Sequence, residues 1–586
     1  MKCGDDDNDS VFSGDSDSQL QPEDEFRIDR GSLARVARTC RQLWNPSVAI
    51  LWRELPTLTP ILLTLPADLY TLELVHSEES EPPLLDPSRD LYRLIPTSFA
   101  TTVEVEPTRT ETLADRIELR LLRDPRLQDF VRWTLYTQYI QDVGSEPKTI
   151  GLSQLARVSF PPGVWTLLTR YGPNPLFPNV RRLSLHDPET QYLSPNTVFF
   201  LFGGSLLSLH LSATRPQTGF FELLHRLASQ LEELVITKGP GSDPHDVYAG
   251  ISLSLAAHIP ALSCLRVLRI EGVHISTTAL STIGSLPLLE HLSIEVSSPT
   301  CALVHLNSMN SGLFPLIRDL SVIVDDLRWV TTFLDHISSS CLDSVHLMCH
   351  SLIIPPIVFD GLFSTIASRQ WRLALKRITI NTSHEQPPCD LSRSMCRLLP
   401  LPALTVLLMR GWFSIIIDDR TLDAMATAWP RLVNLNLACS PEASRPEYLQ
   451  VIPKATFAGL IPLAYRCRYL RSINMAIDTA ARLPPPEYEY PPRPVLPTES
   501  QLMLLHVGWT GPPRDPMQAA VLLSEIFPRL LTVLYFQRVE EDDRATRGWS
   551  ALLGLLYDFK HIRFQERRWV HGERLYSVPP NRDWGF

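Results

Sequence analysis

The chain has 586 residues, of which 44% are hydrophobic and 20% are charged. This composition is ordinary for a protein that buries a core, and it excludes a wholly disordered chain. The formal net charge of −10 argues against a nucleic-acid-binding protein that works by neutralising phosphates.

The sequence has no basic-plus-apolar segment typical of a signal peptide and no apolar run of about 18 residues or more. We therefore expect no membrane contact and a cytoplasmic or nuclear location. The ten cysteines contain no C-x-x-C pair, which favours thiols in a reducing compartment over a disulfide framework or a zinc site.

Residues 1–30 contain ten acidic and three basic residues, a net charge of −7. The remaining chain is therefore nearly neutral. Because this segment has few apolar residues, we expect a disordered acidic tail.

Residues 31–55, GSLARVARTCRQLWNPSVAILWREL, predict a short helical hairpin. Ser32 is the expected N-cap of the first helix. Asn45 and Pro46 are expected to cap and begin the second helix. The apolar residues at helical spacing are Leu33, Val36, Ala37, Cys40 and Leu43, followed by Val48, Ile50, Leu51 and Trp52.

A pattern of apolar residues at positions 1, 4 and 6 then recurs along the chain. Its first residues are Val180, Leu206, Leu231, Leu265, Leu289, Ile317, Leu342, Leu375, Leu404, Leu432, Leu470, Leu502 and Leu530. Successive copies lie between 24 residues (Leu265 to Leu289) and 38 residues (Leu432 to Leu470) apart. This regular spacing favours a structural repeat over chance.

Helix-like segments lie between most of these copies, for example at 220–230, 277–286, 330–340, 421–429 and 517–527. A strand followed by a helix every 25–30 residues or so is the leucine-rich-repeat pattern. We therefore predict an α/β leucine-rich-repeat solenoid shaped as a horseshoe, with a parallel sheet on the concave side and helices on the convex side. No single repeat should be stable alone.

The expected domain organisation follows from these segments. Irregular first repeats or a cap occupy 56–175, the repeat domain 176–540, and a C-terminal cap 541–586. Residues 484–497, PPPEYEYPPRPVLP, form a proline-rich loop within the repeat domain.

The fifth position of each triplet should face the open concave side. Across the thirteen copies this row is mixed and carries little charge, which suits a protein ligand better than a polyanion. The candidate partner-binding residues are His210, Arg269, Ser293, His346, Asn436, Asn474 and His506.

Catalytic signatures are absent from the sequence, which lacks a phosphate-binding glycine loop, a metalloprotease H-E-x-x-H and a nucleophile elbow. We interpret the acidic pairs Asp325-Asp326 and Asp418-Asp419 as solvated charges, and a metal or acid–base role as the weaker alternative. The scattered histidines favour no shared metal or catalytic site. We therefore expect neither enzymatic activity nor a metal or cofactor.

The stretch at 33–55 resembles the second half of an F-box as found in fungal F-box proteins. The matching residues are Leu33, Ala37, Arg38, Cys40, Pro46, Leu51 and Trp52. The segment at 502–530 also resembles the last repeats of such proteins. The Leu-Pro-rich helix with which an F-box begins has no counterpart in residues 1–30, so the start is either truncated or degenerate.

The resemblance implies a substrate-recognition subunit of a cullin–RING ubiquitin ligase that binds a Skp-type adaptor and a protein substrate. The residues implied in adaptor binding are Leu33, Val36, Ala37, Cys40, Leu43, Trp44, Pro46, Leu51 and Trp52. We expect no nucleic-acid partner and a monomer outside the complex. The alternative is an interaction scaffold whose degenerate F-box serves only as an N-terminal cap.

Overall fold

The computed structural model describes most of the chain in short consecutive ranges. These are residues 30–75, 116–144, 158–159, 162–185, 198–213, 220–238, 249–296, 312–351, 353–385, 389–412, 415–437, 453–483, 500–508, 510–535 and 543–570. The acidic segment 1–29 and the proline-rich loop 484–497 lie outside the described residues.

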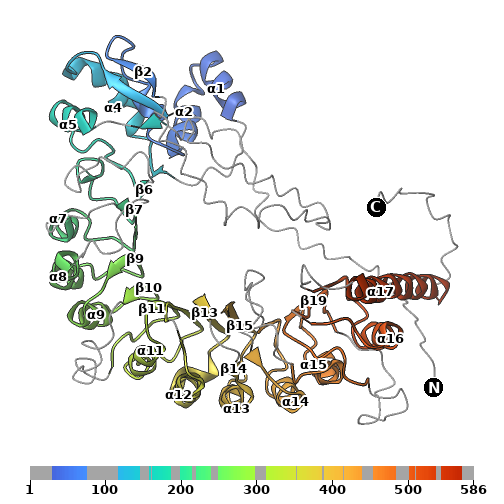
Figure 1. The fold of residues 1–586 in the computed structure, drawn as a ribbon. Coiled ribbons are helices and arrows are strands. Elements are labelled where there is room, and N and C mark those ends of the chain that lie inside the picture. The colour runs from blue at the N-terminus through green and yellow to red at the C-terminus, as the bar shows by residue number, and fades with distance from the viewer. Residues whose placement is uncertain are drawn as a thin grey trace, which may run out of the picture.

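One parallel sheet of 15 strands runs through the described chain (Figure 1). Its strands, in spatial order, are β1 (Glu54–Leu55), β4 (Asp142–Val143), β6 (Arg182–Leu185), β7 (Ser208–Ala213), β8 (Glu233–Lys238), β9 (Val267–His274), β10 (His291–Val296), β11 (Asp319–Val324), β12 (Ser344–Cys349), β13 (Arg377–Glu385), β15 (Val406–Trp412), β17 (Asn434–Asn436), β18 (Ser472–Asn474), β19 (Leu504–His506) and β20 (Thr532–Leu534). The spatial order follows the chain order, as expected for a protein built by stacking consecutive units.

The helices lie on one side of this sheet and follow one another along the outer side of a curved row (Figure 1). They are α5 (Pro162–Tyr171), α7 (Phe220–Leu227), α8 (Ala249–His258), α9 (Thr277–Gly284), α11 (Leu327–Leu334), α12 (Pro356–Ser368), α13 (Ser392–Met395), α14 (Asp419–Ala428), α15 (Leu460–Arg466) and α16 (Pro516–Ile526). Each of the five helix-like segments named from the sequence overlaps one of them.

The repeated apolar triplets form the core between the sheet and the helices. In the copy that begins at Leu265, the side chains of Leu265, Leu268 and Ile270 are fully buried. Adjacent copies align residue for residue, so that Leu292 of β10 pairs with Leu320 of β11. All thirteen predicted triplets contribute strands to the one sheet, which confirms the prediction of a shared parallel sheet.

The sheet also contains two strands that the triplet pattern did not identify. β1 and β4 have only two residues each, and they pair with each other although they are far apart in the sequence. At the end of β4 the chain places Gly144 against β6, where a Cβ atom would lie 1.7 Å from the Ser184 carbonyl oxygen. Gly144 also has φ +78°, so this close approach requires glycine.

A second, three-stranded sheet lies between β1 and β6 in the sequence. It comprises β2 (Tyr70–Val75), β3 (Arg116–Leu121) and β5 (Val158–Ser159), and it is accompanied by α3 (Thr59–Leu62), a 3₁₀ turn η2 (Leu127–Phe130) and α4 (Val131–Thr137). This sheet explains why β1 and β4 are separated along the chain.

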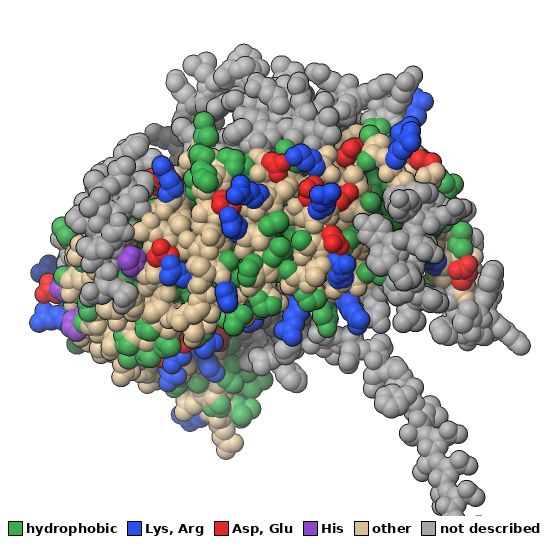
Figure 2. All heavy atoms as spheres, turned by 90° about the horizontal axis from the view of Figure 1, so that it is seen from below, with side chains coloured by type: hydrophobic (Ala, Val, Ile, Leu, Met, Phe, Trp, Pro, Cys, Tyr) green, Lys and Arg blue, Asp and Glu red, His purple; other side chains and the backbone are tan. Residues whose placement is uncertain are grey.

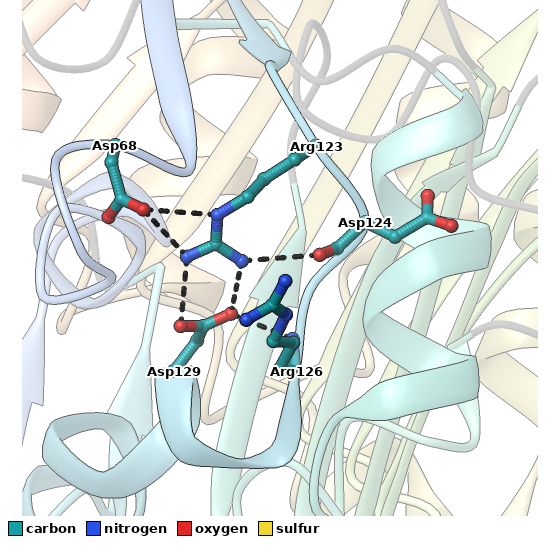
Figure 3. A network of polar contacts seen from close by, with 5 residues as sticks. All are labelled: Asp68, Arg123, Asp124, Arg126 and Asp129. Atoms are coloured by element: carbon teal, nitrogen blue, oxygen red, sulfur yellow. Dashed lines mark hydrogen bonds and ion pairs between the residues drawn. The ribbon is translucent and has the colours of Figure 1, made fainter.

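The Arg123 guanidinium fixes the turn after β3 (Figure 3). It donates to both oxygens of Asp129, at 2.7 and 3.0 Å, and to Asp68 at 2.9 Å. The buried Asp129 carboxylate also accepts from the Arg126 backbone nitrogen at 2.7 Å. The hydrogen bond from Arg123 is the main cause that lowers the pKa of Asp129. The arginine is therefore a structural bridge between the segments before β2 and after β3.

Two helices occupy the F-box-like segment, α1 (Arg30–Thr39) and α2 (Trp44–Arg53). The predicted caps are wrong. Ser32 lies inside α1, and α2 begins before Asn45, with Leu43 at its N-cap and no side-chain cap. Asn45 is therefore a residue of the first turn of α2, and Pro46 follows it without an interior hydrogen bond to lose.

Ion pairs join successive repeats on the helical side. Arg397 bonds to Asp360 at 3.2 Å, and Arg466 bonds to Asp423 at 2.6 Å. Figure 2 views the molecule from below Figure 1, toward the lower row of helices, and shows basic and acidic side chains interspersed among the described residues. Mixed charge of this kind is typical of a solvated surface and does not indicate a nucleic-acid-binding face.

At the C-terminal end, α17 (Asp543–Val570) packs against α16. Its buried Trp549 stacks on Tyr535, just after β20, with ring centroids 4.9 Å apart. A short two-stranded pair, β14 (Cys389–Asp390) with β16 (Ile415–Ile416), links two neighbouring repeats in the middle of the molecule.

Candidate binding surfaces

The face of the large sheet opposite the helices carries every second side chain of each strand. We call it the open face. The strand register places the fifth triplet positions in one continuous row across it. This middle row comprises Ser184, His210, Val235, Arg269, Ser293, Ser321, His346, Thr379, Leu408, Asn436, Asn474, His506 and Leu534.

The seven predicted partner-binding residues all lie in the middle row. Six of them are partly or fully exposed, as a binding role requires. His506 is the exception, because only 7% of it is exposed. Whether these residues bind a partner stays a prediction.

Glu233 of β8 is held by side chains of the neighbouring strand β7. Ser208 Oγ donates to its carboxylate at 2.7 Å, and His210 Nε2 lies 3.3 Å from the other carboxylate oxygen. The hydrogen bond with His210 is the largest cause that lowers the pKa of Glu233 from 4.5 to about 2. His210 is therefore engaged within the protein, and the sequence analysis did not identify its partner.

Two further acids on this part of the open face have partners on adjacent strands. The Asp319 carboxylate of β11 lies 2.6 Å from His291 Nδ1 of β10. The Glu295 carboxylate of β10 accepts from the Gly272 backbone nitrogen of β9 at 2.7 Å, where β9 departs from regular pairing. Internal contacts of the sheet therefore occupy these acids.

His346 lies at the centre of a neutral hydrogen-bonded chain across β11, β12 and β13. The Asn381 amide nitrogen donates to His346 Nε2 at 3.1 Å, and His346 Nδ1 lies 3.4 Å from Ser321 Oγ. Burial lowers the pKa of His346, so the imidazole is neutral at pH 7. Its one proton then lies on Nδ1, directed at Ser321.

His506 and Asn474 form a second neutral pair, between β18 and β19. The Asn474 side-chain oxygen accepts a hydrogen bond from His506 Nδ1. Burial lowers the pKa of His506 to about 4. This histidine is therefore uncharged near neutral pH and belongs as much to the core as to the open face.

The predicted adaptor-binding residues divide by exposure into three groups. Ala37 is buried, and five are half-buried: Leu33, Cys40, Trp44, Leu51 and Trp52. Val36, Leu43 and Pro46 are exposed, and Ile50, which the sequence analysis left out of this set, is exposed as well. The exposed fractions of the three aliphatic residues are 37% for Val36, 46% for Leu43 and 44% for Ile50.

Trp52 joins α2 to the rest of the molecule. Its ring stacks on Tyr136 of α4, with centroids 4.4 Å apart and an interplanar angle of 15°. The strand β1 starts directly after α2, so this helix leads straight into the large sheet. Trp52 is therefore a packing residue as well as a candidate for contact with a partner.

The acidic pairs have structural roles that their interpretation as solvated charges missed. Asp326 and Asp418 are the N-caps of α11 and α14, where each accepts from a backbone nitrogen of the first turn. Asp419 accepts from the backbone nitrogen and the hydroxyl of Thr456 in the next repeat. These contacts explain why acidic residues precede the two helices.

Among the described residues, no group of three His, Cys, Asp or Glu side chains is arranged to hold a metal ion. The described cysteines are free thiols. In the same part of the chain, no helix has the length and hydropathy needed to cross a bilayer.

Fold and surfaces together define an α/β protein in which one large parallel sheet is backed by helices on one side and exposed on the other. No family model and no curated protein matches the sequence. Among solved structures, the chain is similar to one described as the crystal structure of the Rad7 and Elc1 complex in yeast. The identity is 12% and the TM-score is 0.30, over 66% of this chain and 77% of that chain. A similarity this distant assigns no function, so the proposals below rest on the residues of this chain.

Proposed function

We propose that this chain is a non-enzymatic, leucine-rich-repeat substrate-recognition subunit of a cullin–RING ubiquitin ligase. In this proposal α1 and α2 bind a Skp-type adaptor, and the concave open face of the horseshoe-shaped sheet binds a protein substrate. The protein positions its substrate for ubiquitin transfer and does no chemistry itself.

The observation that carries the proposal is the exposed apolar surface of the F-box-like segment. Val36 of α1, Leu43 between the two helices and Ile50 of α2 are exposed, whereas Ala37 and Val48 are buried. Exposing aliphatic side chains to water is unfavourable, and such a group of residues is typical of a protein-binding surface. The resemblance of residues 33–55 to the second half of an F-box suggests the Skp-type adaptor as the partner.

Co-purification of the full chain with a Skp-type adaptor tests the proposal. We expect Leu43→Asp together with Ile50→Asp to abolish the association, because two charges would be buried in the interface. Leu373→Asp, at another exposed leucine, is the matched control and should leave binding intact. If the unmodified chain does not bind the adaptor, the proposal is rejected.

The stacking of Trp52 on Tyr136 and the direct passage from α2 into β1 favour a second candidate function. In that alternative, α1 and α2 are only an N-terminal cap that covers the first strands of an interaction scaffold. It predicts that Trp52→Ala lowers the melting temperature while the unmodified chain binds no adaptor. Adaptor binding by the unmodified chain would instead support the ligase proposal.

A further inference from the structure

Two arginines on the open face have no partner among the described residues. Arg377 begins β13 and Arg410 lies in β15, and both side chains are exposed. Two cations of the same region are paired with acids: Lys376 bonds to Asp343 at 2.9 Å, and Arg397 bonds to Asp360 at 3.2 Å.

The open face around these arginines lacks compensating acids. Glu385, at the end of β13, pairs with Trp412 beyond a shift in register. From β12 to β20, the other open-face positions, those in regular register, carry no aspartate or glutamate. They are Ser344, His346, Met348, Arg377, Thr379, Asn381, Val406, Leu408, Arg410, Asn434, Asn436, Ser472, Asn474, Ala476, Leu504, His506, Gly508, Thr532 and Leu534. His346 and His506 are neutral at pH 7, as described above. These positions therefore carry two arginines and no acid, in contrast to β8–β11, which carry Glu233, Glu271, Glu295 and Asp319.

The chain of hydrogen bonds through His346 adds a further donor to the same region. Asn381 donates to His346 Nε2, so the Nδ1 proton is directed at the Ser321 oxygen. The Ser321 hydroxyl hydrogen is then available to a ligand acceptor. Two guanidinium groups and this hydroxyl together make the region a surface of donors.

We propose that the open face over β11–β15 binds an acidic segment of the protein partner, with its anionic oxygens on Arg377 and Arg410. This inference rests on the proposed role of the open face in substrate binding and adds the chemistry of the substrate. Arginine presents a planar fork of donors that matches both carboxylate and phosphate oxygens.

The register sets the scale of the ligand. Arg377 pairs with Val406, and Arg410 lies four residues further along β15. Their Cα atoms are therefore about 14 Å apart, from a rise of ~3.3 Å per residue and a strand spacing of ~4.8 Å. Two acidic side chains four residues apart in an extended segment match this distance. Two arginines are too few for nucleic acid, which is bound through about six to ten phosphate contacts.

Fluorescence anisotropy with labelled synthetic peptides tests the proposal on the full chain. The probes are a short glutamate-rich peptide, a version with phosphoserine in place of glutamate, and versions with glutamine or lysine at the same positions. We expect the two acidic peptides to bind more tightly than the glutamine and lysine peptides, and high salt to weaken binding. Their relative affinities distinguish carboxylate from phosphate recognition.

Charge reversal locates the site. Arg377→Glu with Arg410→Glu should weaken acidic-peptide binding by about tenfold or more, because unlike charges become like charges. Arg393→Glu with Arg420→Glu, at two exposed arginines of the outer helices α13 and α14, is the matched control and should have little effect. Arg377→Gln with Arg410→Gln, which adds no acids, should give a smaller loss and guards against misfolding.

Three results would overturn the inference: no binding of either acidic peptide, equal binding by the Arg377/Arg410 variants, or an equal loss in the control variant. Adaptor co-purification is measured in parallel on the same proteins. If the unmodified chain binds the acidic peptides but not the adaptor, the proposed ligase role is rejected and acidic-peptide recognition is retained. Failure of peptide binding alone would reject only the recognition chemistry.

Discussion

The two halves of the open face have the same backbone plan but use their polar side chains differently. On β7–β11, acids such as Glu233 and Asp319 are paired with histidines of adjacent strands. On β12–β20, the internal hydrogen bonds join neutral groups, such as Asn474 with His506, and two arginines have no described partner. Internal contacts therefore hold several acids of the first half, whereas two arginines of the second half have no partner among the described residues.

The buried face of the sheet is alike in the two halves. Substitutions in it should have the largest effect on the free energy of unfolding. Leu209 and Leu435 are the second residues of their triplets in β7 and β17, and both are fully buried. Leu209→Ala and Leu435→Ala should each lower the free energy of unfolding by about 2–5 kcal/mol, because each leaves a cavity. Urea unfolding followed by circular dichroism measures both.

Leu373→Ala is the control for these core variants, since Leu373 is exposed, and it should change stability by about 0.5 kcal/mol or less. A much smaller loss for Leu435→Ala than for Leu209→Ala would show that the short strands β17–β20 pack less tightly. The two halves would then differ in the packing of their core as well as in the polar side chains of their open face.

The sequence predicted the buried face far better than the open one. Thirteen triplets identified thirteen strands because burial imposes apolar residues at fixed positions, whatever lies outside. β1 and β4 were missed because their apolar pattern is incomplete: Thr57 and Ser145 stand at the sixth positions, where the triplet requires an apolar residue. Directly after β4, Gly144 stands where a repeat would continue, since the backbone of β6 leaves no space for a side chain.

The open-face contacts could not be predicted because they depend on register between strands about 25 residues apart. His210 was recognised as facing outward, but its partner Glu233 lies on the next strand and in a different row. Arg377 and Arg410 lie in the rows on either side of the middle row, and no periodicity marks an arginine that lacks an ion pair. Only the paired strands show which charges are already engaged.

Removing a paired acid of the first half should have the next largest effect on the free energy of unfolding. Glu233→Ala removes the acceptor of Ser208 and His210 and should lower the free energy of unfolding by about 1–3 kcal/mol near pH 7. Glu271→Ala, at an open-face acid without a described hydrogen bond, should cost less. Thermal unfolding of the two variants in the same buffer measures the difference.

The pH dependence of that loss follows from the lowered pKa of Glu233. Its ordinary value is 4.5 and its folded value is about 2, so the unfolded chain binds the proton more readily in this window. The stabilisation is complete above about pH 4.5 and declines as the pH falls toward 2. The gap between the unmodified protein and Glu233→Ala should narrow accordingly. A gap that widens on acidification would contradict the assigned pairing.

Substituting a neutral pair of the second half should have the smallest effect on stability at neutral pH. The pH dependence of this pair comes from its histidine. His506 has an ordinary pKa of 6.5 and a folded pKa of about 4 because it is buried. Between these values the unfolded chain binds more protons, so stability is full above pH 6.5 and falls toward pH 4. His506→Gln keeps a hydrogen-bond donor and should cost about 1 kcal/mol or less at pH 7. As the pH is lowered through this window, the melting temperature should fall less steeply for His506→Gln than for the unmodified protein. Parallel curves of melting temperature against pH would show that the Asn474–His506 pair does not determine the acid sensitivity of this half.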